Sequence, residues 1–210
     1  MSKRKRQMNI ASPIPSSCIA FSQSRCIAAG NLYDVVAVAK QWLDQNAASN
    51  ILIFDDISSE PVEVDFRGTL KTVLGRLPSE SKAEKPLFEE IVRTPGRPKL
   101  GVVAREVTLL PRHWEWLAAQ PGGASVALRK LVEAASRTNE IKDKQRQAQE
   151  SAYRFLSAMA GNLPGYEESV RALFANMPEQ FGVQTENWSL DIREHARKLA
   201  LRVFVPDERA

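Results

Sequence analysis

The sequence has few of the residues that signal secretion, membrane insertion or metal chemistry. It contains 2 cysteines and 2 histidines, and no apolar run approaches the roughly 18 residues that cross a bilayer. Cys18 and Cys26 are too few for a disulfide framework, so we expect reduced, partly buried thiols. Because the N-terminus lacks an apolar stretch followed by a cleavage site, we expect a cytoplasmic protein that does not enter a membrane.

The sequence also lacks the patterns that support catalysis. His113 and His195 lie far apart, and neither has a cysteine or carboxylate at metal-ligand spacing. There is no glycine-rich phosphate loop, nucleophile elbow or paired-cysteine motif. Asp55, Asp56 and Asp65 can be considered as a metal cluster, but a polar turn between two strands is the favoured interpretation. We therefore predict that the protein is not an enzyme and has no cofactor and no metal.

The charge that is present is unevenly distributed. The net charge of the chain is +4 at pH 7. Residues 1–16 hold 4 basic residues and no acid, residues 17–90 hold 7 basic against 11 acidic residues, residues 91–135 hold 7 against 3, and residues 136–210 hold 11 of each. Positive charge is therefore concentrated in an N-terminal tail, which we expect to be disordered, and in one central segment. Such concentration is typical of contact with a polyanion.

Residues 17–78 predict a small α+β domain. Short apolar runs around turn residues indicate two hairpins, and apolar positions at helical spacing indicate a helix between them, capped by Asn31. The expected elements are strands over 18–21 and 25–28, a helix over 32–46, strands over 51–54 and 62–66, and a short helix over 70–77.

The remainder is predicted to be mostly helical after a linker over 79–101. Residues 102–110 are β-prone, and together with two following helices they form a strand-helix-helix segment over 102–135. The C-terminal region covers 136–210. We expect helices over 112–119, 125–150, 152–160, 166–176 and 190–204, and we expect Ser125 to cap the second of them.

Several aromatic residues are expected in the core. In the C-terminal half they are helix-spaced, and they are Tyr153, Phe155, Phe174, Phe181 and Trp188. His113, beside Trp114 and Trp116, is expected to be a core or interface residue.

The order of elements from 102 to 135 resembles a ribbon-helix-helix module. That fold implies a homodimer, since a lone strand has no partner and two chains pair their strands into one ribbon. The ribbon would lie in the major groove of DNA, and the second helix would begin beside a phosphate, near Ser125. Arg112, at the start of the first helix, is a further candidate for contact with DNA.

The outward face of the strand leaves a second interpretation open. In the register usual for such modules, Arg105, Val107 and Leu109 would face the groove, and only Arg105 is suited to reading bases. The opposite face offers Glu106, Thr108 and Leu110, and the glutamate would repel phosphates. A strand that is apolar on both faces is also typical of a buried strand in a larger sheet.

A basic arm precedes the strand. Gly96-Arg97-Pro98, flanked by Arg93 and Lys99, resembles an AT-hook core, in which proline fixes an extended backbone and arginine lies along a narrow minor groove. The alternative is a Pro-Gly turn with a solvated arginine.

Three stretches resemble a bacterial family known only as a domain of unknown function. They are Ile53 to Asp56 with Val64 to Gly68, the run from Gly96 to Ser125, and Ala152 to Gly161. The resemblance covers roughly residues 17–204 and implies a bacterial cytoplasmic protein, without an activity or a catalytic residue.

The leading hypothesis is a dimeric DNA-binding protein that regulates transcription. Its DNA contacts would come from Arg93, Gly96, Arg97, Pro98, Lys99, Arg105, Thr108, Arg112 and Ser125. The alternative is a non-catalytic interaction or structural protein in which residues 102–110 belong to the core.

Overall fold

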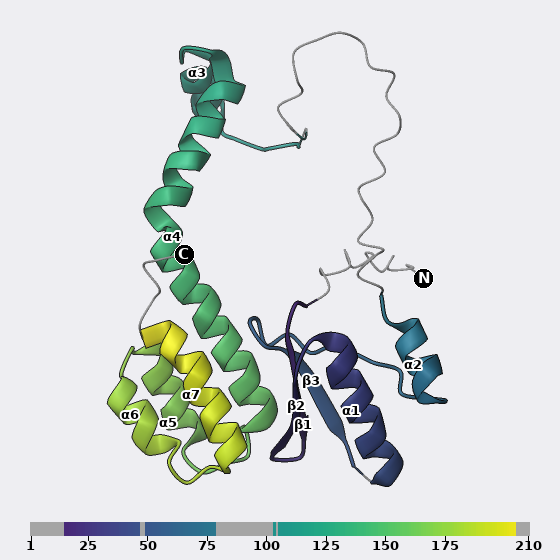
Figure 1. Cartoon of the computed structure of the whole chain (residues 1–210). Coiled ribbons are helices and arrows are strands. Elements are labelled where there is room, and N and C mark those ends of the chain that lie inside the picture. The colour runs from purple at the N-terminus through teal and green to yellow at the C-terminus, as the bar shows by residue number, and fades with distance from the viewer. Residues whose placement is uncertain (1–14, 47–48, 79–102, 104, 205–210) are drawn as a thin grey trace, which may run out of the picture. The chain divides into compact units, whose positions relative to one another are not determined.

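The computed structural model describes residues 15–46, 49–78, 103 and 105–204 (Figure 1). The fold is α+β, as predicted. In chain order the elements are β1 (Cys18–Ser22), β2 (Arg25–Gly30), α1 (Leu32–Gln45), β3 (Ile51–Asp55), α2 (Leu70–Arg76), α3 (Pro111–Ala118), α4 (Gly123–Met159), α5 (Tyr166–Phe174), α6 (Pro178–Gln184) and α7 (Leu190–Phe204). No helix in the described part of the chain is long and apolar enough to cross a membrane.

The described residues form two compact units. The first unit contains residues 15–78 and 144–204, and the second contains residues 103–143 except 104. α4 runs from the second unit into the first. This grouping differs from the division expected from the sequence, which separates residues 17–78 from the C-terminal helices.

The sheet of the first unit has the order β2-β1-β3, and both pairings are antiparallel. β1 and β2 form the first predicted hairpin, with Gln23 in its turn at a φ of 53°. Asn31 caps α1 as expected, because its side chain accepts a hydrogen bond from the Asp34 amide at 2.9 Å.

The second predicted hairpin is wrong. β3 pairs with β1, placing Ile53 opposite Ala20, and residues 62–66 form no strand. The chain returns along β3 only briefly, at one bridge between Phe54 and Pro61. There the Val62 amide donates to the Ile53 carbonyl at 2.8 Å and the Asp55 amide donates to the Glu60 carbonyl at 2.9 Å. Pro61 lies at the start of this return and has no amide hydrogen to extend a ladder. The half-buried side chains of Val62, Val64 and Phe66 instead pack against the α1 core.

β1 lies between two hydrophobic cores. Cys18 and Ala20 pack in one core with α1, whereas Ile19 and Phe21 pack in the other with the C-terminal helices. This follows from the two-residue period of a strand, whose successive side chains point to opposite faces. The sheet therefore lies between α1 and α2 on one face and the C-terminal helices on the other.

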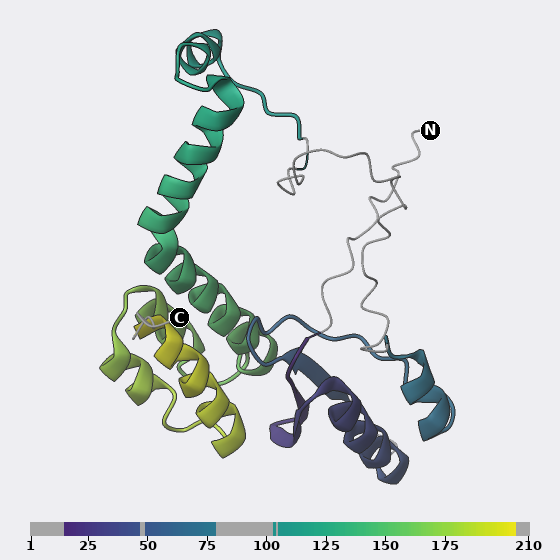
Figure 2. The same cartoon turned by 45° about the horizontal axis from the view of Figure 1, so that its top comes forward.

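The C-terminal helices gather around the end of α4 (Figures 1 and 2). α7 has the bounds predicted for it, and the helices predicted over 125–150 and 152–160 join into the single helix α4. α6 is absent from the sequence prediction, which takes Pro178 and Gly182 as breaks. Pro178 is the first residue of α6, where a missing amide hydrogen has no cost.

The predicted aromatic core is partly confirmed. Phe155, Phe181 and Trp188 are buried. Tyr153 and Phe174 are exposed, and their rings contact each other edge to face with centroids 5.9 Å apart. Helical spacing alone does not separate these two groups, because α4 and α5 are each covered on one side only.

Candidate nucleic-acid interface

The candidate interface begins with the residues ahead of α3. Val103 and residues 105–110 have no regular secondary structure, so the strand predicted over 102–110 is not found in its described residues. A strand needs a neighbour, and the sheet of the described residues is composed of β1, β2 and β3 alone. Arg105 and Thr108 are both exposed in this segment, as a contact surface requires.

Arg112 lies in the first turn of α3 and is exposed. The helix begins at Pro111, and its cap residue, Leu110, makes no side-chain hydrogen bond to it. No acidic residue lies in the first turn. A cation at this end of a helix opposes the helix dipole at a cost of about 0.3–1 kcal/mol. The stability of α3 therefore does not explain Arg112, whereas contact with an external anion would.

The prediction that Ser125 caps the second helix is wrong. α4 begins two residues earlier, at Gly123, so Ser125 lies within the first turn. Gly122 and Gly123 have φ values of 88° and 76°, a conformation that glycine adopts readily. The turn at these glycines therefore leads into the helix without an intervening cap residue at Ser125. Ser125 is exposed, and its carbonyl accepts a hydrogen bond from Arg129 Nε at 3.2 Å.

The predicted basic arm lies outside the described part of the chain. Arg93, Gly96, Arg97, Pro98 and Lys99 all lie outside the described residues, as do the proposed N-terminal tail through residue 14 and the linker over 79–101. The structure therefore places four of the predicted contact residues, Arg105, Thr108, Arg112 and Ser125, in the second unit.

The second unit exposes apolar side chains as well as basic ones. Val107, Leu110, Trp114 and Trp116 are all exposed, the last with 53% of its surface accessible. His113 is exposed too, so it is not a core residue of this chain. DNA contact uses basic and polar groups, and it leaves this apolar surface without an explanation.

Asp55 and Asp56 lie at a polar turn that follows β3. Asp55 Oδ1 accepts hydrogen bonds from the Ile57 amide at 2.8 Å and from the Ser58 amide at 2.6 Å. Asp56 binds Lys198 Nζ through both carboxylate oxygens, at 2.9 and 2.8 Å. Within the described residues no three histidine, cysteine or acidic side chains could hold a metal ion. The predicted polar turn is confirmed, but the second of the two strands that it was expected to join is not formed.

This turn is held by polar groups from α4 and α7. The Ser151 hydroxyl donates to the Ile57 carbonyl at 2.7 Å and lies 3.0 Å from the hydroxyl of the buried Ser59. Arg154 donates to the Ser58 carbonyl at 2.8 Å, and Arg202 donates to the Ile57 carbonyl at 2.9 Å. These bonds satisfy carbonyls of the turn, so the basic groups stabilise the protein's own fold.

His195 of α7 is a buried titratable group of the first unit. Its ring lies between Phe155 and Phe21, with centroids 4.5 and 5.8 Å away, and only 5% of its surface is exposed. Nε2 is buried without a hydrogen-bond partner. Burial is the main reason that its pKa is lowered to about 4, with Lys198 acting in the same direction and Asp56 opposing. His195 is neutral at pH 7.

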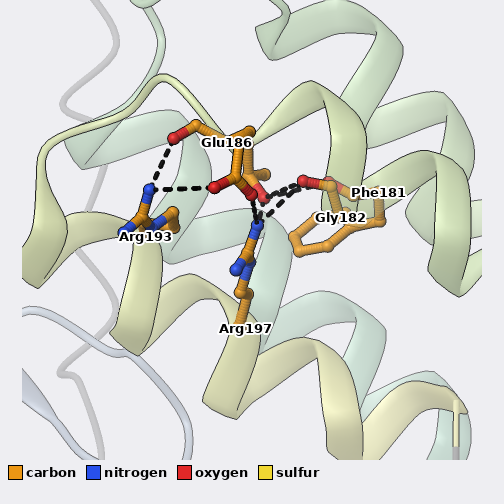
Figure 3. A network of polar contacts seen from close by, with 6 residues as sticks. Phe181, Gly182, Glu186, Arg193 and Arg197 are labelled. Atoms are coloured by element: carbon orange, nitrogen blue, oxygen red, sulfur yellow. Dashed lines mark hydrogen bonds and ion pairs between the residues drawn. The ribbon is translucent and has the colours of Figure 1, made fainter.

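A second ionic group fastens α6 to α7 (Figure 3). Glu186 lies between Arg193 and Arg197, and Arg197 Nη2 donates to its carboxylate at 2.6 Å and to the Gly182 carbonyl at 2.9 Å. The hydrogen bond from Arg197 holds the pKa of the Glu186 carboxyl below its usual value, and the charges of Arg197 and Arg193 act in the same direction. Since all three side chains are partly or fully exposed, the group orients the helices more than it stabilises them.

Both cysteines are free thiols. Burial raises the pKa of Cys18 to about 11 and also raises that of Cys26, so neither has the thiolate character of a reactive cysteine. The expectation of reduced, partly buried thiols is confirmed.

These features define an α+β protein in which helices cover both faces of a three-stranded sheet. The chain belongs to a bacterial family described as "Uncharacterized protein conserved in bacteria (DUF2239)", whose model matches residues 17–200. The resemblance found in the sequence is thereby confirmed, and the family's description names no activity. The chain matches no curated protein and no solved structure.

Sequence reasoning missed the polar contacts that join the two ends of the chain. Ser59 and Ser151 are 92 positions apart, and Asp56 and Lys198 are 142 apart. No spacing rule connects residues at such separations. Sequence reasoning also made no prediction that His195 is buried. Its position in an apolar helix pattern was the one signal that could have indicated this.

Proposed function

We propose that this chain is a non-catalytic DNA-binding protein whose second unit contacts the nucleic acid as a homodimer. The observation that carries the proposal is Arg112, an exposed cation in the first turn of a helix that gains nothing from it. Arg105 is exposed seven residues earlier in the same segment. Residues 91–135 hold 7 basic against 3 acidic residues, and this excess favours phosphate contact.

A homodimer would account for residues 105–110. They are β-prone but have no strand partner among the described residues of their own chain, and Val107 and Leu110 are exposed. Pairing with the same segment of a second chain would satisfy the backbone and place Arg105 on a two-stranded ribbon. In this proposal the chain regulates transcription from the cytoplasm of a bacterium.

The test is the salt dependence of binding to a mixed-sequence duplex, followed by fluorescence anisotropy. Several phosphate contacts should make the logarithm of affinity fall steeply with the logarithm of salt concentration, by about 0.9 per contact. The double variant Arg105→Ala and Arg112→Ala should bind more weakly and lower this slope by roughly 2. Arg171→Ala, at an exposed position on α5, serves as the matched control and should bind as the natural chain does.

Two outcomes decide against the proposal. The first is the absence of binding to any duplex at low salt. The second is equal loss of affinity in the double variant and in the Arg171 control. Arg97→Ala tests the arm separately, since a minor-groove contact should weaken binding to A·T-rich duplex more than binding to other sequences.

A further inference from the structure

Residues 129–142 of α4 form a stretch of helix with no covered face in the described part of the structure. Every residue from 129 to 142 is exposed, although the helix continues on both sides of this stretch. Helices in proteins owe most of their stability to the packing of one amphipathic face, and short helices alone in water are marginal. About four turns of helix are thus exposed on every side among the described residues, which suggests that a partner covers one face.

An apolar stripe runs along this stretch at alternating steps of four and three residues. It comprises Leu131, Ala134, Thr138 and Ile141. Leu131 and Ile141 have 48% and 54% of their surface exposed. Steps of four and three keep side chains on one side of a helix, as in helices that pack along one another.

The same stripe is buried further along α4. Continuing the four-three steps from Ile141 leads through Gln145 to Ala148, Ala152 and Phe155, all three of which lie in the hydrophobic core of the first unit. One face of one helix is thus packed at its C-terminal end and exposed before it. The exposed part, residues 129–142, is called the α4 stripe surface below.

The charges beside the stripe surface are basic on both sides. Lys130 and Arg137 each precede a stripe residue by one position, and Lys142 follows Ile141 by one. Glu133 and Glu140 also precede stripe residues by one position. At about 100° per residue, however, they lie about 120–140° around the helix from the middle of the stripe, whereas Lys130, Arg137 and Lys142 lie about 60–80° from it. The surface is therefore an apolar stripe with a basic border.

This combination distinguishes between three kinds of occupant. DNA would neutralise the border but would leave Leu131 and Ile141 in water. A second copy of the same helix would place Arg137 opposite Lys142 in a parallel pair, or Lys130 opposite Arg137 in an antiparallel pair. An amphipathic helix with acidic residues beside its own apolar stripe would bury Leu131 and Ile141 and would also neutralise the basic border.

We propose that the α4 stripe surface is the docking site for an acidic amphipathic helix of a partner protein. The contact is separate from the DNA contact proposed above, and either can hold without the other. It gives a role to residues that the DNA proposal does not use.

The experiment is the titration of the full chain into a fluorescent probe peptide, followed by anisotropy at low salt. The probe is a synthetic helix of about three heptads with leucine at the stripe positions and glutamate beside them, a length at which isolated helices begin to form. Its control carries lysine in place of glutamate. The glutamate peptide should bind at least about ten-fold more tightly than the lysine peptide.

Two variants test the stripe and its border separately. Leu131→Asn with Ile141→Asn should weaken binding of the glutamate peptide by about ten-fold or more, since it removes the apolar contact. Lys130→Glu, Arg137→Glu and Lys142→Glu together should reverse the preference between the two peptides. Arg129→Glu, on the far side of the helix, is the matched control and should change affinity by less than about two-fold. Circular dichroism shows whether each variant keeps its helix.

Three results would overturn the proposal. One is equal affinity for the two peptides, and another is no binding of the glutamate peptide. The third is a dimer in sedimentation equilibrium that the Leu131 and Ile141 variant dissociates, which would assign the surface to a second copy. If the three glutamate substitutions abolish DNA binding and the peptide does not bind, the border belongs to the DNA interface instead.

Discussion

At the scale of single residues, the first unit depends on a few side chains whose surroundings change their chemistry. His195 is the clearest example, because it is a titratable ring placed where aromatic carbon surrounds it. Burying a neutral histidine in such a place costs little free energy, whereas burying a protonated one requires the loss of its hydration. Its Nε2 atom contributes no hydrogen bond, so the residue acts mainly as an aromatic packing group.

This arrangement predicts a specific dependence of stability on pH. The pKa of His195 is about 4 in the folded chain, against 6.5 for the unperturbed group. Its contribution to stability is therefore complete above pH 6.5 and is lost as the pH falls from 6.5 towards 4. Between pH 7 and 5 the loss should be about 2 kcal/mol. Urea unfolding at the two pH values measures it.

The matching variant is His195→Phe, which keeps a ring in the core and has nothing to protonate. The variant should lose about 2 kcal/mol less than the natural chain between pH 7 and 5. Glu186 and Asp65 have lowered pKa values and stay ionised in this window. An unchanged pH dependence in the variant would mean that another group is responsible.

At the scale of elements, turns are set by backbone requirements that side-chain patterns do not express. Gly165 precedes α5 with a φ of 78°, and a Cβ atom there would lie 2.8 Å from the backbone oxygen of Gln184. The loop between α4 and α5 is also tied by Trp188, whose Nε1 donates to the Pro164 carbonyl at 2.8 Å. Close approach of two backbones therefore selects glycine at this position.

Gly165→Ala should destabilise the chain by roughly 2 kcal/mol or more, since it combines an unfavourable φ with a collision against backbone. Gly182→Ala is its control. Gly182 lies inside α6, and a Cβ atom there would meet nothing within 4 Å. Alanine at 182 should therefore be neutral or stabilising by up to about 1 kcal/mol. Thermal unfolding compares the two, and equal effects would contradict the steric argument.

At the scale of the whole molecule, the two ends of the chain share one core. Phe155 of α4 contacts Phe21 of β1 and Phe54 of β3, with ring centroids 5.4 and 5.8 Å apart. The polar contacts of Asp56, Ser59 and Ser151 join the same elements. The N-terminal sheet and the C-terminal helices should therefore unfold together.

Phe155→Ala should cost about 3–5 kcal/mol and should weaken the N-terminal sheet as well as the helices. The measurement is amide hydrogen exchange of β1, which should quicken in the variant as much as that of α7. Phe174→Ala, at an exposed position, should cost less than about 1 kcal/mol and leave β1 unchanged. Faster exchange confined to the helices would show that the two ends are independent domains.

Much of the local structure could be predicted from the sequence. Asn31 identifies the start of α1, and the apolar spacing from Leu190 to Phe204 gives α7 its observed bounds. The candidate interface is less predictable. Arg105 and Arg112 are exposed as expected, but the strand around Arg105 is not formed, and the glycines before α4 leave Ser125 inside the helix.

The sequence by itself determined the α+β class, the first hairpin and the position of most helices, because these depend on short-range periodicity and on caps. Only the tertiary structure decided that β3 pairs with β1, that residues 15–78 and 144–204 form one unit, and that His195 is buried. The reason is that these features join residues far apart in the chain. Local patterns show which side chains prefer to be buried, and they do not show which distant surface will cover them.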